Sequence, residues 1–172
     1  MAANSYGLVL HDLDRLDEAV EVYRHGVALC EATNDHHLRG VLLVNLAGSL
    51  NAASDDSDEA IATWLEGAEF LIATDDHGNA LVVLGNLADG LELAERYEEA
   101  VAVRTRAAEA AALTEDGRTE ALALRRLAAA LRLAGNGDAA VAAYTRAADA
   151  YAEAGDGTGE AEVRAELAAL LR

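Results

Sequence analysis

The sequence contains no proline and no lysine, and it has one cysteine and few aromatic residues. Without proline, no helix is interrupted by a missing backbone donor and a ring that clashes with the preceding turn. The single cysteine, Cys30, excludes an intramolecular disulfide and suits a reducing compartment. No charged-then-apolar leader opens the chain and no apolar run reaches the length of a membrane span, so we expect a cytoplasmic protein.

Acidic residues dominate the charge of the chain, with 31 Asp and Glu against 13 basic residues and a formal net charge of −18. This charge repels phosphate backbones and anionic membrane surfaces, so we expect neither a nucleic acid nor a membrane as partner. It is compatible with a basic partner, and equally with an acidic surface that only maintains solubility. The abundance of Ala, Leu, Glu and Arg, all strong helix formers, indicates an all-α fold.

A set of small and large residues recurs along the chain at nearly constant spacing. In one copy the set is Leu87-Ala88, Ala100, Arg104 and Ala107. The same frame occurs as Tyr6-Gly7, Ala19, Tyr23, Gly26; as Leu46-Ala47, Ala60, Trp64, Gly67; and as Leu127-Ala128, Ala140, Tyr144, Ala147. The small residue of the first pair recurs after 40, 41, 40 and 40 positions, the last time at Ala168. Four landmarks in register four times indicate tandem repeats.

Each repeat divides into two helices, here called helix A and helix B. Helix A carries apolar residues at helical spacing, such as Leu84, Leu87 and Leu91. Helix B follows a polar turn and begins with acidic residues, which suit the positive end of the helix dipole. Segments such as Thr33-Asn34-Asp35 separate the repeats and predict turns with N-caps for the next helix A. We expect a single domain, 1–172, with repeats near 1–35, 36–75, 76–116 and 117–156 and a final helix at 158–172.

The order Leu-Gly/Ala, then Ala-x3-aromatic-x2-Ala/Gly, resembles the tetratricopeptide repeat (TPR). The resemblance implies a right-handed α-solenoid of about four TPR-like hairpins with a C-terminal capping helix, because single hairpins cannot bury their apolar faces. The family's usual repeat has about 34 residues, whereas six extra residues enter each repeat here and the terminal proline is absent. Both departures resemble the longer repeats of kinesin light chains, polarity adaptors and bacterial signalling regulators. HEAT and armadillo repeats share the length but not the small-residue pattern.

Motifs for catalysis are missing from the sequence: it has no GxSxG elbow, P-loop, HExxH or CxxC. A nucleophile built on Cys30 needs a nearby base, and His25, five positions earlier, lies off the same helical face. We therefore expect a protein that is not an enzyme and that uses no cofactor.

Two histidine-containing turns leave a metal site open as an alternative. Asp35-His36-His37 and Asp75-Asp76-His77 occupy equivalent positions between repeats, and imidazole with carboxylate can bind a divalent metal. We favour helix caps and solvated imidazoles, since later repeats have glycine where the histidines continue. The acidic run at 55–59 lacks the glycine and distal glutamate of an EF-hand, so it predicts a turn and helix cap. No metal is expected.

The resemblance implies that helix A lines a concave groove in which peptides bind, and that Asn45 and Asn86 fall where family members often hold an extended backbone. An amide suits that role because it both donates and accepts. Three arginines on one helix favour a carboxylate ligand. The predicted groove comprises Asn4, Ser5, Asn45, Asn86, Asp89, Glu92, Arg125, Arg126 and Arg132. The alternative is a merely solvated face, with the arginines neutralised by Glu92, Glu162 and Glu166.

Two functions follow. The first is a scaffold or adaptor that binds a protein or an extended peptide; the alternative is the sensor or oligomerisation region of a larger bacterial signalling or transcription regulator.

The first helix is apolar on nearly every side, through Tyr6, Leu8, Val9, Leu10 and Leu13. Such a helix is normally buried all round, so it predicts a preceding repeat that is missing here, self-association, or packing against a partner. The alternative is an apolar first helix that is tolerated in solution.

Overall fold

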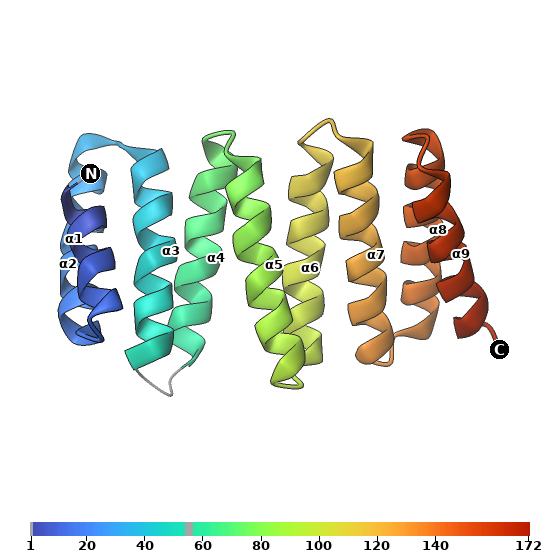
Figure 1. Cartoon of the computed structure of the whole chain (residues 1–172), viewed down its shortest axis with the longest axis horizontal. Helices are drawn as coiled ribbons and strands as arrows, with labels where there is room; N and C mark the ends of the chain where they lie inside the picture. Colours follow the sequence, from blue (N-terminus) through green and yellow to red (C-terminus); the bar gives the residue numbers. More distant parts are fainter. Residues whose placement is uncertain (1, 54–56) are drawn as a thin grey trace. The chain divides into compact units, whose positions relative to one another are not determined.

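The computed structural model describes residues 2–53 and 57–172, and this part of the chain is helical with no strand. Its helices are α1 (Ala2–Asp12), α2 (Leu16–Thr33), α3 (His36–Ala53), α4 (Ser57–Ala73), α5 (His77–Leu93), α6 (Tyr97–Ala112), α7 (Gly117–Leu133), α8 (Gly137–Glu153) and α9 (Gly157–Leu170). Figure 1 shows them as successive hairpins. The helix A and helix B of each predicted repeat are therefore present, and α9 is a further helix A. The all-α fold with a final helix is confirmed.

The chain divides into two compact units, Met1–Val83 and Leu84–Arg172, so the boundary falls within α5. In the first unit α1 packs on α2 and α3, α2 packs on α3, and α3 packs on α4. In the second unit α6 packs on α7, α7 on α8, and α8 on α9. That the whole chain forms a single domain stays a prediction.

The turns reverse the chain through a left-handed residue at the end of each preceding helix. These residues are Asp14, Asn34, Asp75, Glu95, Glu115, Gly135 and Gly155, with φ between 55° and 78°. At the first of them, the Arg15 N–H donates to the Leu10 carbonyl and the Asp14 N–H donates to the His11 carbonyl, both at 2.9 Å. This pair of bonds satisfies carbonyls that the helix end would leave without partners. The corresponding predicted turn at Ser54-Asp55-Asp56 lies outside the described residues.

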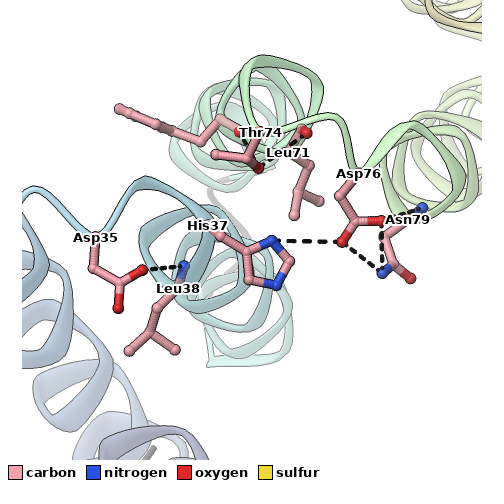
Figure 2. Close-up of polar contacts among 8 residues, drawn as sticks. Asp35, His37, Leu38, Leu71, Thr74, Asp76 and Asn79 are labelled. Atoms are coloured by element: carbon pink, nitrogen blue, oxygen red, sulfur yellow. Dashed lines mark hydrogen bonds and ion pairs between the residues drawn. The ribbon is translucent and has the colours of Figure 1, made fainter.

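An aspartate caps each helix A after the first, as the sequence predicts. Asp35 Oδ1 accepts from the Leu38 N–H at 3.1 Å (Figure 2), and Asp156 Oδ1 accepts from the Gly159 N–H at 3.0 Å. Asp116 accepts from the Arg118 N–H at 3.1 Å and from the Thr119 hydroxyl at 2.6 Å. These bonds lower the pKa of Asp116. Capping satisfies N–H groups that have no partner within the helix.

The first unit has a core of leucine and aromatic side chains. Its fully buried members include Leu10, Tyr23, Leu42 and Leu71. Trp64, which occupies the repeat position of Tyr23, is only partly buried against this core. Gly7 makes the packing of Tyr23 feasible, since a Cβ there would lie 2.5 Å from the ring. The small residue predicted at this landmark therefore accommodates the ring of its own hairpin.

The second unit relies on alanine, which lets helices approach closely. Its buried alanines are Ala88, Ala100, Ala107, Ala108, Ala110, Ala111, Ala121, Ala123, Ala128, Ala130, Ala140, Ala143, Ala147 and Ala148. Larger buried side chains, such as Leu84, Leu124 and Tyr144, fill the remaining space. In α9, Val163 is fully buried, whereas Leu171 lies past the end of the helix and is 68% exposed.

None of the helices in the described residues is long and apolar enough to cross a membrane.

Candidate functional site

Two side-chain pairs join α1 and α3 on the helix A surface of the first unit. Asn45 donates through Nδ2 to Asn4 Oδ1 at 2.6 Å, so two predicted groove residues lie together. His11 Nδ1 lies 3.0 Å from Ser49 Oγ, and Ser49 is fully buried. Sequence reasoning missed this second pair, although Ser49 is four residues after Asn45 and therefore on the same helical stripe. Ser5 is exposed beside Asn4 on α1.

In the second unit, Asn86 is exposed on α5, and Arg126 of α7 extends to the same part of α5. The Arg126 Nη1 atom lies 3.7 Å from the point that a Cβ on Gly85 would occupy. This is an ordinary van der Waals distance, so the Arg126 guanidinium lies against α5 at Gly85, the residue before Asn86. Within the described ranges, 2–53 and 57–172, Arg126 has no ion pair.

Arg104 stands where the other repeats have an aromatic residue. It is buried, with its side chain 5% exposed. Its Nε donates to Glu92 Oε1 at 3.0 Å, and Nη2 contacts Asp89 Oδ1. Glu92 and Asp89 remain 24% and 60% exposed. Both predicted acidic groove residues therefore compensate a buried cation, because a buried charge needs paired hydrogen-bonding partners.

Arg125 is held between α7 and α9. Its Nη1 donates to Glu162 at 2.7 Å and its Nε donates to Glu166 at 3.1 Å. The hydrogen bond with Glu166 is the main cause that raises the pKa of Arg125. The predicted neutralisation by Glu162 and Glu166 thus holds for Arg125, whereas Glu92 pairs with Arg104.

A hollow opens on the second unit where α7, α8 and α9 meet. It has a volume of about 600 Å³ and is lined by Ala129, Arg132, Tyr144, Glu166, Ala169 and Leu170. Arg132 and Glu166 lie close enough to Tyr144 to act on its pKa. Burial raises the pKa of Tyr144, as does Glu166, while Arg132 acts in the opposite direction. Donor, acceptor and apolar surface therefore converge in one concave place, as in small binding sites generally.

The histidine-containing turns lie in the first unit (Figure 2). His37 Nδ1 faces Asp76 Oδ2 at 3.7 Å, while the same carboxylate accepts from the Asn79 side-chain amide at 2.9 Å. His36 stacks on Phe70 with ring centroids 5.8 Å apart. In residues 2–53 and 57–172, no three His, Cys, Asp or Glu side chains are placed to hold a metal ion. Asp76 instead works as a helix cap.

Cys30 is buried in α2. Burial, and then Asp35, raises the pKa of its thiol, which disfavours the thiolate that a nucleophile requires. His25 is exposed, whereas Cys30 is directed into the core.

Comparison with solved structures gives the fold. A Podosopora anserina protein assigned to the kinesin light chains, with nearly identical TPR-like repeats, has 19% sequence identity and a TM-score of 0.53, covering 99% of this chain and 93% of its own. A variant of that protein has 19% identity and a TM-score of 0.55, covering 98% and 92%. The chain has a TPR-like repeat fold. No family model matches the sequence, and no curated protein matches it either.

Proposed function

We propose that this chain is a non-catalytic scaffold that binds an extended segment of another protein on the helix A surface of its second unit. The hollow between α7, α8 and α9 carries the proposal, because it offers an open volume with Arg132, Tyr144 and Glu166 at its wall. A TPR-like fold supports it, since such repeats commonly act as interaction scaffolds. The sensor or oligomerisation role, the bacterial source and the cytoplasmic location stay predictions.

The charges around the hollow favour a ligand with a carboxylate. Glu166 is compensated by Arg125, so its negative charge does not dominate the wall. Arg132 forms no ion pair among the described residues, and its neighbour Tyr144 is a neutral group, so its positive charge is available to a ligand. A guanidinium can meet a carboxylate with two parallel hydrogen bonds. The exposed Asn86 and Arg126 extend the polar surface along α5 and α7.

The test is binding of an immobilised library of unstructured nine-residue peptides that differ in carrying Glu or Lys at one position. We expect Glu peptides to be selected, with NMR shift changes at Ala129, Arg132 and Ala169. The variant Arg132→Gln should weaken binding about tenfold, the equivalent of one charge-assisted hydrogen bond. Arg146→Gln, which changes an exposed arginine on α8, is the matched control and should leave affinity unchanged.

Selection of Lys peptides, or equal loss of affinity in both variants, would contradict a carboxylate-binding hollow. Shift changes confined to residues outside α5, α7 and α9 would show that the helix A surface is not the binding site. The double change Asn45→Ala with Asn86→Ala tests the predicted asparagines separately. If they hold the backbone of the peptide, each lost hydrogen bond should cost about 0.5–1.5 kcal/mol of binding energy.

A further inference from the structure

An apolar face lies along α1 and α2 of the first unit. Tyr6 is 55% exposed and Val9 is 53% exposed, although both belong to a regular helix. Two hollows of about 300 and 530 Å³ adjoin this face, and both are lined by Tyr6, Glu21 and Val22. Because they share these residues, the two hollows form one trough between α1 and α2, here called the α1–α2 trough, with the Tyr6 ring in its wall.

The repeat shows what kind of structure covers this position elsewhere. Tyr6 corresponds to Leu46, Leu87 and Leu127, which are 6%, 7% and 8% exposed. Leu46 is buried in a core cluster that includes Leu10 and Tyr23, so helices of the preceding hairpin cover it. The same place in helix A is buried in the three later repeats, and at Leu46 the cover comes from helices of the preceding hairpin, which favours a helix as the occupant of the α1–α2 trough.

The rim of the trough is acidic. Asp17, Glu18 and Glu21 line it. Glu18 is paired with Arg15 at 2.6 Å, while Glu21 has only a 3.8 Å contact with Arg24 and an 80% exposed side chain. Within the described part of the chain, Asp17 has no ion-pair partner. Opposed rims of the same sign repel, and each chain carries a net charge of −18, so charge disfavours a second copy as the occupant.

We propose that the α1–α2 trough binds a basic amphipathic helix of a different protein. The apolar stripe of that helix packs on Tyr6, Val9 and Val22, as in other helix-in-groove complexes. Lysine or arginine beside the stripe faces Asp17 and Glu21 across the rim. This surface is separate from the hollow in the second unit, so either can fail without the other.

The test uses two designed helical peptides with the same leucine stripe, one flanked by lysine and one by glutamate, and measures fluorescence anisotropy against the full chain. The lysine peptide should bind and should shift NMR signals of α1 and α2, and added salt should weaken it. Tyr6→Ser with Val9→Ser should reduce affinity at least about tenfold, given the apolar area removed. Leu93→Ser, at an 88% exposed leucine, is the matched control and should change nothing.

The charge is tested by Asp17→Asn with Glu21→Gln, which should weaken the lysine peptide several-fold and bring its affinity closer to that of the glutamate peptide. Equal binding of the two peptides to the unchanged chain would overturn the proposal, because only nonspecific apolar contact would remain. A dimer in sedimentation that Tyr6→Ser with Val9→Ser dissolves would overturn it too, because a second copy would then be the occupant. Retained signal dispersion in NMR spectra must show that each variant is folded.

Discussion

Tyr23 and Tyr144 occupy the same position of the repeat, one in each unit, and their hydroxyl groups have opposite surroundings. Tyr23 is fully buried, and its hydroxyl has no hydrogen-bond partner among the described residues. Tyr144 is 3% exposed, yet it lines an open hollow together with Arg132 and Glu166. The same side chain is thus a packing element in the first unit and part of a candidate binding surface in the second.

The difference arises from two positions near the tyrosine, one on helix A of its own hairpin and one on helix A of the next repeat. Where the fourth hairpin has Arg132, the first has His11, and where α9 has Glu166, α3 has Asn45. Both first-unit side chains have other partners, since His11 contacts Ser49 and Asn45 bonds to Asn4. The Tyr23 hydroxyl therefore finds no partner, although polar residues occupy both positions. A repeat can keep its packing frame while the polar neighbours decide whether a site forms.

Truncating the packing ring should have the largest effect. Tyr23→Ala removes a fully buried aromatic side chain, and it should cost about 3–5 kcal/mol of unfolding free energy. Because contacts in repeat proteins are between neighbours, hydrogen exchange should show the loss in the first unit. Trp64→Ala should cost less, because its ring is only partly buried. If Trp64→Ala loses as much unfolding free energy as Tyr23→Ala, or more, side-chain burial does not determine which variant is less stable.

In the third repeat, Arg104 occupies the position of Tyr23 and Tyr144. Arg104→Met leaves Glu92 and Asp89 without their partner and should cost about 1.5–3 kcal/mol, the range for bonds to charged groups. Adding Glu92→Leu should recover most of that loss, since an apolar pair can replace a buried ion pair. Urea unfolding of both variants measures this. If the double variant is no more stable than Arg104→Met, the unpaired Glu92 carboxylate is not the cause of the destabilisation.

Much of the fold could be predicted from the sequence because it depends on local chemistry repeated in register. The small-residue landmarks predict the hairpins, and Asp35, Asp76, Asp116 and Asp156 predict the caps of helix A. The Arg104–Glu92 pair could also have been predicted. In the repeat, Arg104 occupies the position of Tyr144 and Glu92 the position of Arg132, and these positions of helix B and helix A lie close together.

The hollow could not be predicted in the same way. It depends on how far the side chains of α7, α8 and α9 leave space between them, and no sequence spacing encodes that. Nor could spacing tell which of the adjacent Arg125 and Arg126 is neutralised. Arg125 faces Glu162 and Glu166 on α9, whereas Arg126, one residue later, lies against Gly85 of α5. A rotation of about 100° per residue around the helix separates their environments.

Removing only the hydroxyl groups should give smaller effects of opposite sign. Tyr23→Phe deletes a buried group without a partner, so it should stabilise the protein by about 1 kcal/mol. Tyr144→Phe removes a hydroxyl that lies beside Arg132 and Glu166 at the wall of the open hollow, so it should destabilise by about 0.5–1.5 kcal/mol. Denaturant unfolding of both variants under one condition measures the difference. Two effects of the same sign would mean that the hydroxyl groups do not differ in the way the structure indicates.

The smallest effect should appear only at alkaline pH. Burial raises the pKa of both tyrosines, with Asp12 adding to the shift for Tyr23 and Glu166 for Tyr144. Below the unfolded value of about 10 both states keep the proton, so the tyrosines contribute no pH dependence. As the pH rises above that value, the unfolded chain releases protons that the folded chain retains, and stability falls until the folded pKa is passed. Tyr23→Phe and Tyr144→Phe should each reduce this fall between about pH 9 and pH 11. Unfolding free energies measured across that range would contradict the assignment if both variants followed the unchanged chain.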